Sequence, residues 1–152
     1  MADFNIKRSL TWIQSHFAAS GYFRGAVIGH PWTAPTGRIT VAIFMESQTI
    51  LNLTVGGSTQ ELHVITARVF RPALSEPVAE VESDIAEAVS LVQADLLADT
   101  TLGSTVMTID PAGMSGTGMS TAFGHVEIGG TNFRIADITI PLIVNDSATM
   151  AV

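Results

Sequence analysis

The stretch from Ser75 to Asp146 constrains the fold most, because it changes from helical periodicity to strand periodicity. Ser75-Glu76-Pro77 supplies a cap residue, an acid and a proline, which together favour a helix start, and the helix should end near Asp99 to Gly103. Between these points, the apolar residues recur at helical spacing and predict one face that packs on a sheet. These residues are Val78, Val81, Ile85, Val89, Val92 and Leu96.

The rest of this stretch predicts three strands that close the sheet. Gly129-Gly130 suits the tight turn of a hairpin between the last two of them. Pro141 lacks a backbone N–H, so it indicates an edge position or a bulge in the final strand. The expected strands are Thr105 to Asp110, Ser120 to Ile128 and Thr131 to Val144, with a mobile Gly/Met-rich loop from Pro111 to Gly118.

A first helix is predicted near the N-terminus. Ile6, Leu10, Ile13 and Phe17 fall in one stripe, which Asp3 or Asn5 could cap and Gly21 could close. Trp12 lies more than about 100° around the helix from this stripe. We therefore expect Trp12 to be exposed in a monomer.

Three strands are expected between the two helices. Tyr22 to Ile28 predicts a short edge strand, and Arg38 to Glu46 should pair antiparallel with Gln60 to Arg71 because both are rich in β-branched and aromatic residues. Ser47 to Thr59 is long for a hairpin turn, so we expect residues 47–59 to form a projecting loop. The tail, residues 147–152, is expected to be loose.

Together these elements predict one α+β domain over residues 1–152. It should be a mixed, mostly antiparallel β-sheet packed by two α-helices, with a long hairpin arm and flexible loops. A chain of 152 residues is long enough for one real core.

The composition excludes several classes of protein. A net charge of −7 with only seven Lys and Arg argues against stable DNA binding, and the absence of Cys excludes disulfides and thiol chemistry. No apolar run approaches the roughly 18 residues of a membrane span, so we expect a soluble protein. Charged residues make up 14% of the chain, against about 25% in typical domains. Partners could therefore cover part of the surface.

The second helix is acidic on the face opposite its apolar stripe, where it carries Glu80, Asp84 and Glu87 with Leu91 among them. One interpretation is a solvated face that keeps the protein soluble. Another is a face bordering a channel or a partner, where negative charge repels DNA phosphate. Paired carboxylates for acid-base catalysis would need a concave site, which the sequence does not indicate.

No catalytic, cofactor or metal site is predicted. The glycines from Gly113 to Gly118 precede a strand and have no nearby Lys, unlike a phosphate-binding loop. The four histidines lack metal-ligand spacing. A competing hypothesis from another class is a small α+β enzyme or ligand-binding domain that uses His63 or His125 beside a carboxylate such as Asp110 or Asp137.

Five residues are candidates for an interface. Tryptophan is enriched at interface hot spots and is costly to expose, which singles out Trp12 and Trp32. Leu91 interrupts the acidic face, and Met114 and Met119 belong to the loop expected to order on contact.

The order of elements, together with several apolar and glycine patterns, resembles the tail terminator proteins of long-tailed, siphovirus-type bacteriophages. These patterns are Gly29-His30-Pro31, Leu102-Gly103, Ile109-Asp110-Pro111-Ala112-Gly113, Gly124-His125-Val126-Glu127-Ile128, Phe133-Arg134-Ile135-Ala136 and Ile140-Pro141-Leu142. They are spread over most of the chain.

The resemblance implies a structural protein of the virion and no enzyme. Such a protein forms a homohexameric ring on the phage tail tube, stops its polymerisation and offers a surface to the head-tail connector, while double-stranded DNA passes through the ring. The expected location is the head-proximal end of the tail, after assembly in the bacterial host cytoplasm. A neighbouring head-tail connector, head-closure or tail-completion protein is the alternative within the same class.

Overall fold

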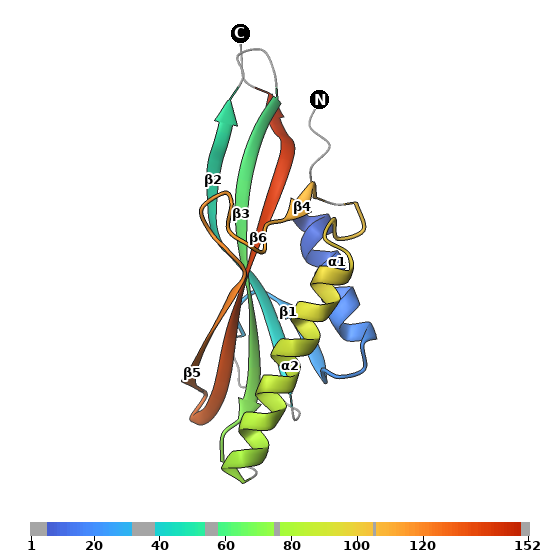
Figure 1. Ribbon diagram of the computed structural model, residues 1–152. Coiled ribbons are helices and arrows are strands. Elements are labelled where there is room, and N and C mark those ends of the chain that lie inside the picture. The colour runs from blue at the N-terminus through green and yellow to red at the C-terminus, as the bar shows by residue number, and fades with distance from the viewer. Residues whose placement is uncertain (1–5, 32–38, 54–57, 75–76, 105, 150–152) are drawn as a thin grey trace.

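The computed structural model describes residues 6–31, 39–53, 58–74, 77–104 and 106–149. Two helices and a six-stranded, mostly antiparallel sheet make up the described part, which confirms the α+β prediction (Figure 1). In chain order, the elements are α1 (Ile6–Ala19), β1 (Gly25–Ile28), β2 (Thr40–Leu53), β3 (Ser58–Pro72), α2 (Val78–Ala98), β4 (Thr108–Ile109), β5 (Ser120–Ile128) and β6 (Thr131–Thr149).

The strands follow the order β1-β2-β3-β6-β4, with β5 also paired to β6. Only β1 and β2 are parallel, and the predicted antiparallel pairing of β2 with β3 is confirmed. Gly129 and Gly130 have φ values of 59° and 80°. Two successive positive φ values are those of a tight hairpin turn, which agrees with the turn predicted there between β5 and β6.

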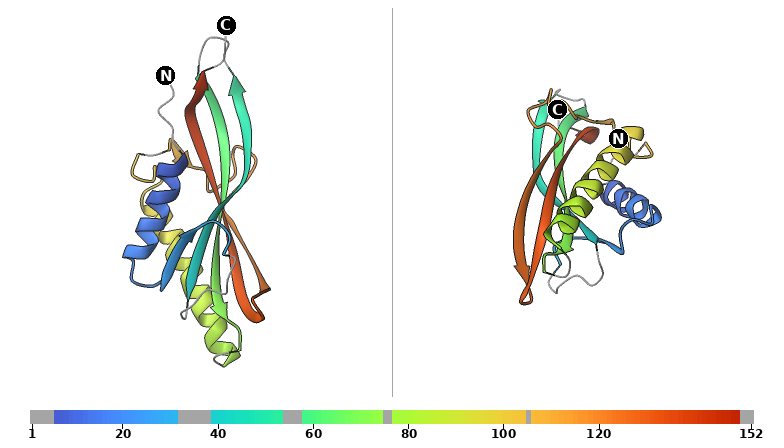
Figure 2. Two further views of the ribbon diagram at one scale, coloured as in Figure 1. Left: turned by 180° about the vertical axis from the view of Figure 1, so that it is seen from behind. Right: turned by 60° about the horizontal axis from the view of Figure 1, so that its bottom comes forward.

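Both helices cover one face of the sheet (Figure 2). Ile13 and Phe17 of α1 are fully buried, as are Ile85 and Val92 of α2. Each such side chain contributes roughly 1.5–3 kcal/mol through burial. Val78, predicted to lie in the buried stripe, is instead 77% exposed because α2 begins beyond the ends of the strands (Figure 1).

The opposite face of the sheet has a smaller core. Phe70 and Phe133 meet edge to face with ring centroids 5.8 Å apart. Val126 and Ile128 of β5 pack against this cluster. The β5-β6 hairpin therefore supplies much of the cover on the side that the helices leave open.

The expected loop over residues 47–59 is wrong for most of its length. Residues 47–53 continue β2 and residues 58 and 59 begin β3, while residues 54–57 lie outside the described part. The pairing of β2 with β3 continues past residue 46, with a register shift of one residue near Glu46 and another near Leu51. Such bulges let paired strands bend without separating. The arm that projects beyond the helices is thus a strand hairpin (Figure 1).

The expected loose tail is also wrong for residues 147–149, which extend β6 to the partner pair Ser58 and Thr149. Residues 150–152 lie outside the described part. Pro141 lies between the stretches of β6 that pair with β5 and with β4. Its carbonyl accepts a hydrogen bond from Asp110 N at 3.0 Å, so its missing N–H faces away from β3. The expected edge position or bulge is wrong, because β6 lies between β3 and β4 and its register with β3 is regular at Pro141.

The Gly/Met-rich loop is organised around Asp110, whose buried carboxylate accepts hydrogen bonds from the backbone N–H groups of Met114 (3.1 Å) and Ser115 (2.8 Å). Gly113 has a φ of 75°, and a Cβ there would lie 2.8 Å from the backbone nitrogen of Gly118. The loop expected to be mobile therefore has a defined, internally hydrogen-bonded shape.

Candidate interaction surface

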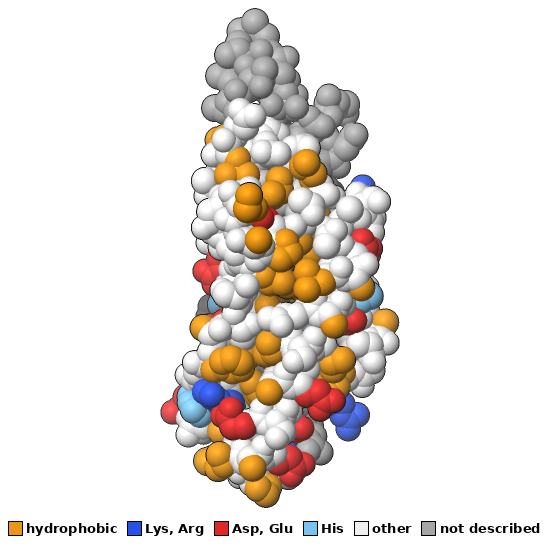
Figure 3. Space-filling view, viewed as in Figure 1, with side chains coloured by type: hydrophobic (Ala, Val, Ile, Leu, Met, Phe, Trp, Pro, Cys, Tyr) orange, Lys and Arg blue, Asp and Glu red, His pale blue; other side chains and the backbone are white. Residues whose placement is uncertain are grey.

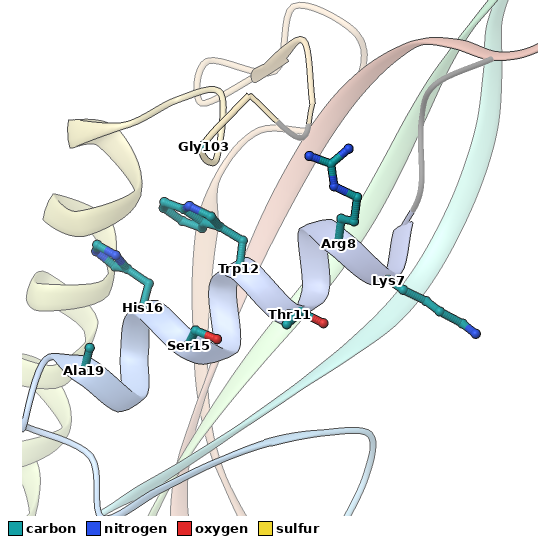
Figure 4. A pocket seen from close by; sticks show the side chains of 8 residues that line it. All are labelled: Lys7, Arg8, Thr11, Trp12, Ser15, His16, Ala19 and Gly103. Carbon is teal, nitrogen blue, oxygen red and sulfur yellow. The ribbon is translucent and has the colours of Figure 1, made fainter. Parts of the chain in front are cut away.

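An open hollow lies between α1 and the loop that follows α2 (Figure 4). The burial of Ile13 and Phe17 fixes the rotation of α1, so that Arg8, Trp12 and His16 point to the side of the helix where Gly103 lies (Figure 4). The residues around the hollow are Lys7, Arg8, Thr11, Trp12, Ser15, His16, Ala19 and Gly103.

The indole of Trp12 lies directly against Gly103. A Cβ at this glycine would be 2.5 Å from Trp12 Nε1 and 2.7 Å from Cδ1. Leu102, Gly103 and Ser104 have φ values of 49°, 65° and 66°, so three successive left-handed residues bring the backbone up to the ring.

Trp12 is therefore half-buried and packs against the main core, so the expectation that it is exposed in a monomer is wrong. A projection of the helix shows only how far Trp12 lies from the stripe. It carries no information about a loop folded from another part of the chain.

Asp99 holds this loop in place at the end of α2. Its carboxylate accepts hydrogen bonds from Gly103 N (2.9 Å), Thr101 Oγ1 (2.9 Å) and Thr101 N (3.2 Å). These hydrogen bonds lower the pKa of Asp99 below its ordinary value of 3.8, and the bond from Gly103 has the largest effect. The floor of the hollow is thus fixed by the charged side chain of the residue that directly follows α2.

His16 links α1 to α2 at the rim of the hollow. Its ring stacks on Trp12 at a centroid distance of 4.8 Å and an interplanar angle of 7°. Its Nε2 lies 3.6 Å from Asp95 Oδ2. Further along, the Tyr22 hydroxyl donates to the backbone carbonyl of Asp84 at 3.0 Å, so the two helices form one connected layer.

Charge is segregated between the two helices. The only charged or titratable side chains of α1 are Lys7, Arg8 and His16, whereas those of α2 are all acids: Glu80, Glu82, Asp84, Glu87 and Asp95. Lys7 and Arg8 are exposed. The same layer therefore presents a basic helix beside an acidic one.

Two arginines of the sheet, Arg68 and Arg134, form ion pairs within the fold. Arg68 forms two hydrogen bonds with Asp137, at 2.6 and 2.9 Å, and these raise its pKa. Arg134 Nε lies 2.7 Å from Glu82. Their charge is compensated within the fold.

The three acids expected to face a lumen or solvent occupy different environments. Glu87 is exposed and Glu80 is half-buried. Asp84 does not simply face solvent, because its Oδ2 lies 3.0 Å from Nε of Arg71, which is only 1% exposed. The strand beneath α2 ends in a buried cation, and that cation draws Asp84 toward the sheet.

The outermost face of α2 carries little charge. Its exposed positions include Ala79, Ser83, Ala86, Ser90 and Ala94. Exposed helix faces normally carry charged and polar residues. Leu97 is also exposed here, and Leu91 is 37% exposed on the flank next to Glu87.

Large apolar residues are also exposed elsewhere. Leu74 and Val78 are both highly exposed and line a second hollow, together with His125 and Arg134. Hydrophobic side chains are visible along the face that carries α2 and at the end where this helix begins (Figure 3). Val78 lies in the first turn of α2 and was predicted to be buried, whereas Leu74 lies in the segment before α2 and was not assigned to any element.

Of the four interface candidates that the structure describes, Trp12 lines the hollow beside α1. Met114 is exposed, whereas Met119 is half-buried and packs against the main core. Trp32 lies outside the described residues. Arg8, His16 and Gly103 were not predicted to belong to an interface. The pair Lys7-Arg8, at the start of a helix without acidic residues, was the signal that could have identified Arg8.

The structure places the two histidines of the competing hypothesis in different surroundings. His63 is 2% exposed, with its Nδ1 3.2 Å from Gln48 Nε2 and its Nε2 3.5 Å from Glu61 Oε2. His125 is exposed on β5. Among the described residues, no group of three or more His, Asp or Glu side chains is placed to hold a metal ion.

Neither of the two described helices is long and apolar enough to cross a membrane. No protein-family model matches the chain, and no curated protein sequence matches it.

Proposed function

We propose that this chain is a structural virion assembly protein, the tail terminator of a long-tailed bacteriophage. In this proposal, six copies form a ring on the last ring of the tail tube, stop its polymerisation and offer a joining surface to the head-tail connector. Double-stranded DNA passes through the ring.

The proposal rests on the outer face of α2, which carries little charge. A lone globular domain gains solubility from charge on its exposed helices, yet the centre of this face is Ala and Ser, with Leu97 and Leu91 beside it. A neighbouring copy would cover such a surface. The low overall content of charged residues fits the same explanation.

The edges of the sheet also suit repeated association. Within the described residues, β1 and β5 each pair on one side only, and they lie at opposite edges of the sheet. Val27 and Ile28 are exposed on one edge, and Phe123 is exposed on the other. Two different surfaces on one chain can generate a head-to-tail ring when the rotation between copies closes.

The shape and charge fit a ring through which DNA moves. The strand hairpin projects beyond the helix layer and could reach an adjoining ring (Figure 1). A net charge of −7 repels DNA phosphate, which favours passage over retention.

The test is to incubate the purified chain with tail tube protein and to examine the tubes by electron microscopy. We expect an additional ring at one end of each tube and shorter tubes than in the absence of the chain. Tubes of unchanged length with bare ends would reject the terminator role. Gold labelling of the chain in intact particles separates a terminator from a head-tail connector, because only a terminator lies directly on the last ring of the tail tube.

A further inference from the structure

We propose that the face of α1 around the Trp12 hollow docks onto α2 of a second copy of this chain. This inference rests on the proposed ring and names one contact between its subunits. Arg8 would meet Glu87, and Trp12 would meet Leu91.

The charges on the two faces are complementary. Arg8 is exposed at the rim of the hollow, on a helix that contains no acid. Glu87 is exposed on a helix that contains no base. Opposite charges brought together across an interface favour encounter and fix the register of the two partners.

The spacing of charged and apolar residues also matches. Trp12 follows Arg8 by four residues, and Leu91 follows Glu87 by four residues, so each pair lies along one helix face. When the two helices run in the same direction, both contacts form at once. The indole is half-buried, which leaves part of the ring free to contact an apolar side chain across the interface.

A second copy fits this surface better than an unrelated partner because each chain carries both halves of the contact. The two helices lie side by side in one layer, so each copy presents a basic and an acidic face to its neighbours (Figure 2). Such a contact can repeat around a ring, or it can close reciprocally in a dimer.

The test reverses one charge on each face. Arg8→Glu makes the α1 face acidic, and Glu87→Arg makes the α2 face basic. Each variant alone should associate about tenfold or more weakly than the wild-type chain, since every contact then joins like charges. An equimolar mixture should recover association to within about threefold, because the altered face of each variant attracts the altered face of the other.

Arg8→Lys is the matched control, since it changes the same exposed side chain but keeps its positive charge. Association is followed by sedimentation of each variant and of the mixture, alone and with tail tube protein. Circular dichroism checks that each variant is folded.

The possible results separate this inference from the proposed function. Weak association of both variants, recovery on mixing and an unchanged control support the docking surface. If the wild-type chain forms a ring that neither reversal weakens, the docking surface is wrong and the ring stands. A dimer that responds to both reversals supports the contact and rejects the ring, whereas a wild-type chain that remains monomeric in every sample rejects both.

Discussion

Replacing Gly103 with alanine alters the floor of the hollow in two separable ways. The backbone has a φ of 65°, a left-handed conformation that costs an L-residue about 1–2 kcal/mol. The new Cβ would also lie 2.5 Å from Trp12 Nε1, so the indole must move. Forced overpacking of this kind costs about 1–3 kcal/mol. We therefore expect Gly103→Ala to destabilise the folded chain by about 2–5 kcal/mol.

Gly130→Ala is the matched control for the backbone contribution. Gly130 has a φ of 80°, and no atom lies within 4 Å of a Cβ built there. We expect this variant to lose only about 1–2 kcal/mol. The difference between the two variants measures the contact with the indole.

Chemical unfolding of the two variants provides the comparison, and each kcal/mol should also lower Tm by about 2–4 °C in a chain of this size. In a Trp12→Ala background, the extra loss at Gly103 should disappear because the clashing ring is gone. If Gly103→Ala and Gly130→Ala destabilise the wild-type chain equally, the indole does not rest on this loop.

Three further predictions concern the ion pairs and the surface. Asp84→Ala leaves the buried Arg71 without this carboxylate and should reduce the free energy of unfolding by about 3 kcal/mol in a urea titration. Asp137→Ala, beside the partly exposed Arg68, should reduce it by about 1 kcal/mol or less in the same titration. The lowered pKa of Asp99 stabilises the fold above the unfolded value of 3.8, and this stabilisation is lost as the pH falls through the folded value. Stability measured against pH should therefore fall less steeply below pH 3.8 in Asp99→Ala, and an unchanged slope would contradict the hydrogen bonds assigned to this carboxylate. Leu91→Ser should weaken association while changing Tm by no more than about 2 °C, since this side chain is partly exposed, and a large loss of Tm would place it in the core instead.

Local patterns predicted the helices and most of the strands. Ile13 and Phe17 are buried as expected, with Ile6 and Leu10 of the same stripe partly buried against the core, because helical spacing fixes which residues share a face. The Gly129-Gly130 turn was equally readable, since two positive φ values suit glycine better than any other residue.

Features that depend on contacts between distant segments could not be predicted in this way. The cover of Trp12 depends on left-handed backbone at Leu102 and Ser104, and neither residue type signals that conformation. The pairing of Asp84 with Arg71 requires α2 to lie over the end of β3, which no local pattern specifies. The extension of β2 past residue 47 depends on bulges that appear only in the strand register.

The mass of the purified assembly tests the central claim most directly. Six copies of a 16.0 kDa chain should give a particle of about 96 kDa, and electron micrographs should show a six-fold ring with a central hole. The account predicts this particle for the chain alone or in the presence of tail tube protein. A single species of 16.0 kDa at every concentration, with and without that protein, would contradict it.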